Sequence, residues 1–357
     1  MKFNRHKILF LSREGVTHPT ALIEYLADKG FSSRSQYLYL LQGKVRRYFS
    51  SNAMISELRR TISEFSPDVI VFNDENSRAG LFAIMRANRK ASKPIIWFRG
   101  AVGGYNALSP IDLYLIKHKN LARLLVRSYA MINNWNASLT MRFLVSKTQV
   151  ECSHHFVERT TSYDEDLSGM RAKWGIASDD IVIGSIANAR PIKNIEFAAK
   201  AVSRVKSNKR IQFLYIGAYD DSFKKRLENL NPGNTIVTGP IPEAKRYAGV
   251  FDIFVSPTKE PGEGFGLAIT EAMMSSVPVV ATQFGGATDI VEHGKTGFLL
   301  PENALSWENA LQKLADDADL RKQMGRAAQI RVLDRFSLDV VAANFIRILN
   351  DVIAENQ

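Results

Sequence analysis

The chain has 357 residues, 45% of them apolar and 23% charged, which is the composition of a globular protein with two domains of ordinary size. Its one cysteine, Cys152, excludes an intramolecular disulfide and any zinc or iron–sulfur site built from several cysteines. No stretch approaches the roughly 18 uninterrupted apolar residues of a membrane span, and the first apolar run is too short for a signal peptide. We therefore expect a cytoplasmic protein.

The net charge of +11 is concentrated in the first half of the chain. Residues 1–163 hold 24 of the 47 Lys and Arg and 11 of the 36 Asp and Glu, a net charge of +13. The remaining residues, 23 basic against 25 acidic, carry −2. The first half therefore suits an anionic partner such as a phospholipid surface, a phosphate-bearing acceptor or nucleic acid. An ordinary basic surface in contact with solvent is the alternative.

Short apolar runs alternate with helical patterns along the first half. Strands of four to seven residues, each followed by a longer helix, are typical of a parallel α/β sheet. The pattern predicts strands over residues 7–13, 36–42, 68–74 and 94–100, and helices over about 20–29, 53–65 and 79–88.

The second half repeats the same alternation and ends in helices. Strands are predicted over residues 180–189, 210–218, 234–240, 252–258, 278–283 and 297–300, and helices over about 194–207, 222–230 and from 305 to the end. The last helical segment, after Ser337, is amphipathic. We predict two doubly wound α/β domains whose boundary lies between residues 160 and 180. Neither half has a GxGxxG after its first strand, so a dinucleotide-dependent dehydrogenase has no support.

One loop in the second half combines glycines with acids. Three glycines in five positions let backbone N–H groups approach a ligand, and the helix that follows adds its positive N-terminal end. They are Gly262, Gly264 and Gly266. Glu263 lies in the loop and Glu271 in the second helical turn, where carboxylates suit sugar hydroxyls. The alternative is an ordinary glycine-rich loop with Glu271 on a solvated face.

The element Glu263-GFGLAIT-Glu271, between DIFVSPT and AMMSSVPVVATQFGG, resembles the retaining glycosyltransferases of family 4, glycosyl transferases group 1. The resemblance is dense over residues 181–300, continues through the last helix and is diffuse before residue 150. It implies the GT-B fold, in which two Rossmann-like domains flank a cleft and a C-terminal helix packs back on the N-terminal domain. The implied parts are an acceptor-side domain (1–165), a nucleotide-sugar-binding domain (166–335) and the crossing helix (336–357).

The resemblance also implies roles for residues in the second half. Glu271 would bind the ribose hydroxyls, and Glu263 would lie beside the donor sugar as a catalytic residue. The backbone of the loop would meet the diphosphate or sugar at Gly264, Phe265, Gly266 and Leu267. Arg190 and Lys193, also catalytic, would stabilise the leaving nucleoside diphosphate, and two cations there remove the need for a metal. A solvated basic pair at a helix start is the alternative.

Further second-half positions carry weaker signals. The family usually frames the base with the backbone after the third strand, here Gly239, Pro240 and Ile241. Gly285 and Gly286 would lie near the diphosphate or serve a tight turn. No acidic metal-binding element stands in a suitable loop, so we expect no metal and no other cofactor.

The first half departs from the family pattern. The loop after the first strand often has two glycines, and here it has only Gly15. Arg99 stands where the family commonly has a histidine near the donor sugar, and it would bind phosphate or an acidic sugar, or only cap a sheet edge. Gly103, Gly104 and His18 are acceptor-side candidates, although His18 is equally a plain surface histidine.

Two basic, leucine-rich stretches, residues 42–49 and 115–132, resemble segments that lie in a membrane interface. The second combines Lys117, Lys119, Arg123 and Arg127 with Leu121, Leu124 and Leu125. The alternative is that these leucines face the core of their own domain.

Together these features predict a retaining, metal-independent glycosyltransferase that moves a sugar from a UDP-, GDP- or ADP-linked donor to a saccharide or lipid-linked acceptor. The resemblance implies a place in bacterial surface polysaccharide or lipopolysaccharide assembly, in the cytoplasm or peripherally on the inner face of the membrane. A nucleotide-sugar hydrolase, epimerase or phosphorylase of the same fold remains an alternative. A non-catalytic nucleic-acid-binding protein is disfavoured, because no basic motif interleaved with aromatic residues appears.

Overall fold

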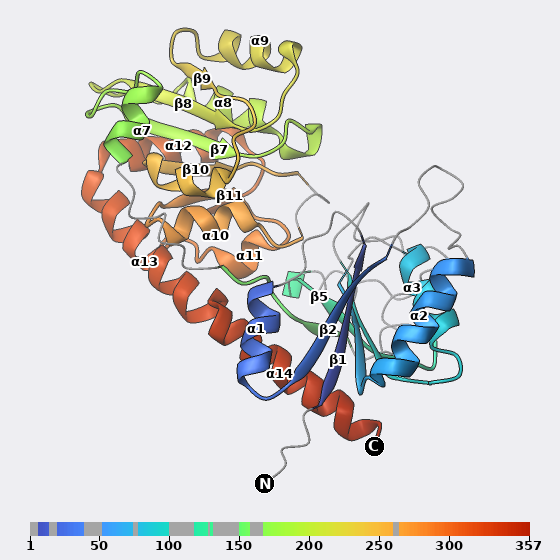
Figure 1. Cartoon of the computed structure of the whole chain (residues 1–357). Coiled ribbons are helices and arrows are strands. Elements are labelled where there is room, and N and C mark those ends of the chain that lie inside the picture. The colour runs from blue at the N-terminus through green and yellow to red at the C-terminus, as the bar shows by residue number, and fades with distance from the viewer. Residues whose placement is uncertain are drawn as a thin grey trace. The chain divides into compact units, whose positions relative to one another are not determined.

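The computed structural model describes residues 6–13, 20–38, 52–73, 78–99, 118–127, 129–130, 150–157, 167–259 and 264–357. The chain forms two compact units, Met1–His154 together with Leu338–Gln357, and His155–Ser337. Among the described residues, each unit contains one six-stranded parallel sheet with helices packed on it (Figure 1). No helix in the described part of the chain is long and apolar enough to cross a membrane.

The sheet of the first unit has the strand order β2-β1-β3-β4-β5-β6. Its strands are β1 (Lys7–Arg13), β2 (Ser32–Leu38), β3 (Val69–Phe72), β4 (Ile95–Arg99), β5 (Leu121–Val126) and β6 (Val150–Cys152). The helices between them are α1 (Thr20–Asp28), α2 (Asn52–Phe65) and α3 (Arg78–Ala87). The apolar runs of β1 and β3 are buried on both faces, as strands of a covered parallel sheet are. The strands predicted at 7–13, 68–74 and 94–100 are confirmed, and β2 begins four residues before its predicted start.

The prediction of a membrane-interface segment within residues 115–132 is wrong for residues 121–126, because these residues form β5. Leu124 and Leu125 are completely buried, and the side chain of Arg123 is 4% exposed. The buried guanidinium is neutralised by Glu151 at 2.9 Å and by Glu355 at 2.7 Å. Because these partners come from other strands and helices, the sequence around Arg123 presents a basic amphipathic pattern where the fold has a core strand. The stretch 42–49 lies outside the described residues.

The last helix, α14 (Leu338–Glu355), belongs to the first unit. It packs against α1 and β3. The ring of Phe345 lies 5.7 Å from that of Phe98 and 6.5 Å from that of Phe10, and all three side chains are buried. The C-terminal helix therefore packs back on the N-terminal sheet, as the GT-B resemblance implies.

The sheet of the second unit has the order β12-β11-β10-β7-β8-β9. Its strands are β7 (Ile181–Ile186), β8 (Ile211–Ile216), β9 (Thr235–Val237), β10 (Ile253–Ser256), β11 (Val279–Thr282) and β12 (Gly297–Leu300). The helices are α7 (Leu167–Lys173), η3 (Pro191–Lys193), α8 (Ile195–Val202), α9 (Asp221–Leu230), η4 (Ala244–Val250), α10 (Leu267–Met274), α11 (Ala287–Ile290), α12 (Ala304–Asp316) and α13 (Ala318–Phe336). All six predicted strands are present.

Alternate residues of these strands enter two hydrophobic clusters, because side chains along a strand point to opposite faces of the sheet. Val182 and Phe254 join the cluster that also contains Ala272 of α10 and Ala328 of α13. Their neighbours on the other face pack with helices α8 and α12. The second unit is thus a three-layer α/β/α structure, in which helices cover both faces of one sheet.

Candidate functional site

The strand order of the second sheet places a topological switch point between β7 and β10. From β7 the chain moves outward through β8 and β9, and then returns to place β10 on the other side of β7. Ligands of open α/β sheets bind beyond the carboxyl ends of strands at such a switch point. The segments that leave these two strands carry Arg190 and Lys193 after β7, and the glycine-rich loop after β10.

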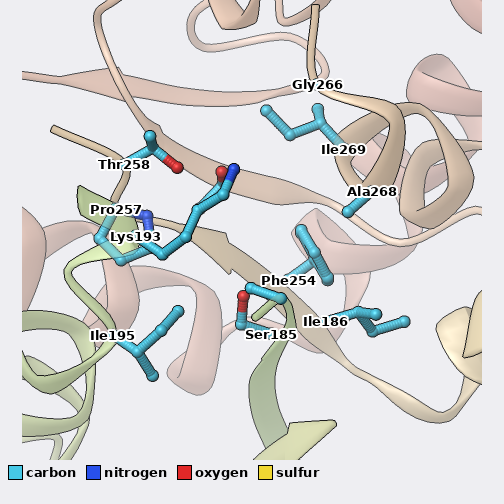
Figure 2. A pocket seen from close by; sticks show the side chains of 12 residues that line it. Ser185, Ile186, Lys193, Ile195, Phe254, Pro257, Thr258, Gly266, Ala268 and Ile269 are labelled. Atoms are coloured by element: carbon cyan, nitrogen blue, oxygen red, sulfur yellow. The ribbon is translucent and has the colours of Figure 1, made fainter. Parts of the chain in front are cut away.

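Lys193 and the start of α10 line one pocket at this edge, together with Thr258 after β10. Lys193 is the last residue of the short helix η3, whose turn is closed by the N–H of Lys193 donating to the carbonyl of Arg190 at 2.8 Å. Figure 2 shows the long side chain of Lys193 extending across the pocket, toward the side on which Gly266 and Ile269 are labelled. The structure therefore brings the cation and the glycine loop together across 73 residues of sequence.

Gly266 begins α10 in a backbone conformation that favours glycine, with φ of +115°. Gly266 is the N-cap residue of α10 and has no side chain, so no capping side chain covers the first N–H groups of this helix. Its neighbour Phe265 is 3% exposed and its ring packs on that of Phe336, whereas Leu267 is 44% exposed. The Phe265 side chain is therefore buried in the core, half-buried Gly264 precedes it, and the contact of this backbone with a diphosphate, which the resemblance implies, stays a prediction.

Glu271 lies on the second turn of α10, and its side chain is half-buried. Burial raises its pKa from 4.5 to about 7, an effect that the charge of Lys245 opposes and the charge of Glu243 reinforces. Both of these residues belong to the start of η4, which packs on α10. Near neutral pH this carboxyl therefore exists both as an acid and as a carboxylate, and a ligand that supplies hydrogen-bond donors would favour the charged form.

Arg190 and Lys193 do not line the same pocket. Arg190 is exposed and lines a neighbouring cavity with Arg226 of α9 and Lys259. The two cations are only three residues apart, at the two ends of the 3-10 turn η3, and they line different spaces. Their pairing at a diphosphate, which the resemblance implies, stays a prediction.

The residues after β9 connect this strand to η4. Gly239 has a φ of +81°, and its carbonyl accepts a hydrogen bond from the N–H of Gly217 at 3.0 Å. Pro240 is exposed, and Ile241 packs against the cluster that includes α10. This segment leads into η4, which contacts α10, the helix that carries Glu271.

Gly286 supports the glycine loop from below. A Cβ atom at this position would lie 2.0 Å from the carbonyl oxygen of Phe265, so only glycine permits this approach of the two backbones. Gly285 beside it has a φ of +56°. Both observations agree with the turn interpretation of this pair.

Several predicted site residues lie outside the described part of the chain: Glu263, Gly15, Gly103, Gly104 and His18. The backbone of Arg99 ends β4, but its side chain also lies outside the described residues.

The structure adds residues that the sequence reasoning missed. Thr258 borders the Lys193 pocket, Lys245 and Glu243 set the charge around Glu271, and the ring of His155 lies 5.6 Å from that of Phe265. Thr258 could have been found from its place directly after a strand that ends at the switch point. Nothing in the sequence near Lys245 or His155 indicates these contacts.

The two parallel sheets and the returning helix α14 define the GT-B architecture, and solved glycosyltransferase structures share it. Sucrose-phosphate synthase from Thermosynechococcus elongatus matches with a TM-score of 0.76 at 15% identity, covering 98% of this chain and 100% of that one. HepE of Anabaena, in complex with UDP and glucose, matches with a TM-score of 0.70 at 17% identity, covering 97% and 100%.

Residues 168–331 match the family model of glycosyl transferases group 1, which confirms the resemblance over the second unit. The chain is 21% identical over 235 residues to N-acetyl-alpha-D-glucosaminyl L-malate synthase of Bacillus anthracis, covering 64% of this chain and 60% of that protein. It is 25% identical over 189 residues to the capsular polysaccharide biosynthesis glycosyltransferase CapM of Staphylococcus aureus, covering 51% and 49%. In both cases the match spans less than two thirds of the relative's own length.

Proposed function

We propose that this chain is a retaining, metal-independent glycosyltransferase that uses a nucleotide-sugar donor and a saccharide or lipid-linked acceptor. The observation that carries the proposal is the pocket at the switch point, lined by Lys193 and by the first turn of α10, with Glu271 one turn further along that helix. A cation and free N–H groups suit a diphosphate, and a carboxyl suits the hydroxyls of a ribose.

In this mechanism the donor diphosphate lies at the start of α10. As the bond between the sugar and the diphosphate breaks, negative charge grows on the leaving oxygen, and the ammonium of Lys193 stabilises it in place of a metal ion. The acceptor hydroxyl attacks from the face that the diphosphate leaves and gives its proton to the leaving phosphate, so the configuration is retained without a covalent intermediate. Glu271 holds the ribose and keeps the donor in position.

The names of relatives support a donor of this class. HepE of Anabaena and TarM of S. aureus are described in complex with UDP, and CapM belongs to capsular polysaccharide biosynthesis. These names support a role in bacterial surface polysaccharide assembly, and we extend the proposal to lipopolysaccharide and to the cytoplasmic side of the membrane.

A panel of donors tests the proposal. Thermal shift of the full chain against UDP-, GDP- and ADP-sugars is expected to give a raised Tm with one nucleotide, because a ligand that binds only the folded state stabilises it. Release of the nucleoside diphosphate, measured with and without candidate acceptors, separates a transferase from a hydrolase. A flat response to every donor would contradict the proposal.

The basic first half motivates peripheral association with an anionic membrane as part of this proposal. Residues 121–126 take no part in it, since they form a core strand. Flotation with anionic liposomes is expected to recover the protein at low salt and release it at high salt. Absence of binding at low salt would remove the membrane from the proposal.

A further inference from the structure

A second cavity lies beside the Lys193 pocket on the same edge of the second sheet. Its volume is about 260 Å³, and Ile195 is the one described residue that it shares with the Lys193 pocket. Its walls come from the segment after β7, the starts of η3 and α8, one face of α9 and the residue Lys259 after β10. The Lys193 pocket does not include this space, although the resemblance also gives Arg190 in its wall a role at the donor.

Three cations from three separate segments line the cavity: Arg190, Arg226 and Lys259. Among the described lining residues Glu196 is the single acid, and it accepts a hydrogen bond from Nε of Arg226 at 2.8 Å. Lys259 pairs with Glu302, which stands outside the lining, at 3.2 Å. Counted over the described residues, the three cations and the two acids that pair with them leave a net charge of +1, and a cavity of this charge would attract an anion.

Both arginines of the lining have N–H donors that no described residue uses. Arg226 uses Nε for Glu196 and Nη1 for Ser222 at 2.9 Å, and among the described residues its Nη2 has no partner. The side chain of Arg190 has no hydrogen bond or ion pair with another described residue. Guanidinium groups bind the oxygens of phosphates and carboxylates with paired N–H donors. Cations arriving from three segments suit the three terminal oxygens of a phosphate better than the single plane of a carboxylate.

The rest of the wall is apolar. Phe223 and Ile195 are 6% and 3% exposed, and Ala189 and Pro191 complete this side. Pockets for drug-sized ligands measure about 300–1,000 Å³, so a cavity of this size suits a smaller ligand. A phosphate alone would leave the apolar side unused, whereas a phosphate carried on a ring of monosaccharide size would cover it.

We propose that this cavity is a second anion site, separate from the donor pocket, that binds the phosphate group of a phosphorylated small molecule of monosaccharide size. The test of this site does not depend on the proposed transfer reaction, because it measures binding directly. Free phosphate carries the same chemistry, and the comparison of two probes distinguishes the two sources.

Calorimetric titration of the full chain at low ionic strength tests the proposal, with glucose 6-phosphate, inorganic phosphate and neutral glucose as probes. Arg226→Gln and Lys259→Gln are each expected to weaken binding of glucose 6-phosphate about tenfold, which is about 1.4 kcal/mol. Lys225→Gln is the matched control, because Lys225 is an exposed cation next to Arg226 that does not line the cavity. Arg190 is left intact, since the resemblance also gives it a role at the donor. Circular dichroism and Tm confirm that each variant folds.

Tighter binding of glucose 6-phosphate than of inorganic phosphate supports a sugar phosphate as ligand, and equal binding supports free phosphate at the same site. Binding that survives in Lys193→Ala keeps the cavity distinct from the donor pocket. The proposal is overturned by no binding of either phosphate, by equal losses in Lys225→Gln, by unchanged binding in the Arg226→Gln/Lys259→Gln double variant, or by loss in Lys193→Ala.

Discussion

Replacing Lys193 by alanine is expected to lower kcat for sugar transfer by about 100- to 1,000-fold, the loss typical of removing one group that stabilises developing charge. The reason is the position of Lys193 opposite the start of α10, where the leaving diphosphate is proposed to lie. The measurement is the initial rate of nucleoside diphosphate release at saturating donor and acceptor. The free energy of unfolding should change little, because Lys193 lies at the edge of the sheet and not in its core.

Lys200→Ala is the matched control for this variant. Lys200 lies on α8, seven residues further along, and its side chain is exposed. It should retain the rate of the parent within about twofold, since exposed surface substitutions have small effects. A correctly folded Lys193→Ala protein that works as fast as the parent would show that the switch-point pocket is not where the diphosphate leaves.

Donor binding is expected to weaken about tenfold between pH 8 and pH 6, because a carboxyl with a pKa near 7 must lose its proton to accept bonds from the ribose. Burial raises the pKa of Glu271 to about 7. The phosphates of a nucleotide-sugar are diesters that do not titrate here, so calorimetry with the intact donor isolates the protein group. Glu271→Gln should bind weakly at both pH values and lose the dependence. A parent protein whose affinity is the same at pH 6 and pH 8 would rule out this role for Glu271.

Unfolding supplies an independent check on the same carboxyl. Its folded-state pKa of about 7 is raised above 4.5, so the native protein binds more protons than the unfolded chain between these values. Stability contributed by Glu271 is therefore present below about pH 4.5 and is lost as the pH rises toward 7. Without donor, Glu271→Gln should unfold at a higher temperature than the parent at pH 8, and the difference should shrink toward pH 5.

The periodicity of the chain predicts most of the second unit because its strands are continuous apolar runs bounded by turns. The prediction of a membrane-interface segment where the structure has β5 failed for a physical reason. Arg123 makes the run LARLLV look amphipathic, and its neutralising partners, Glu151 and Glu355, lie 28 and 232 residues away. No local pattern contains that information.

The sequence by itself determined the alternation of strands and helices, the glycine loop with its two acids, and the resemblance that points to a sugar-nucleotide site. These depend on residues close together in the chain, where spacing and local backbone preference act. Only the tertiary structure decided that Lys193 lines a pocket with the start of α10 while Arg190 lines another cavity, and that burial raises the pKa of Glu271 to about 7. Strand order and helix packing set those outcomes, because they bring distant segments together and remove water from between them.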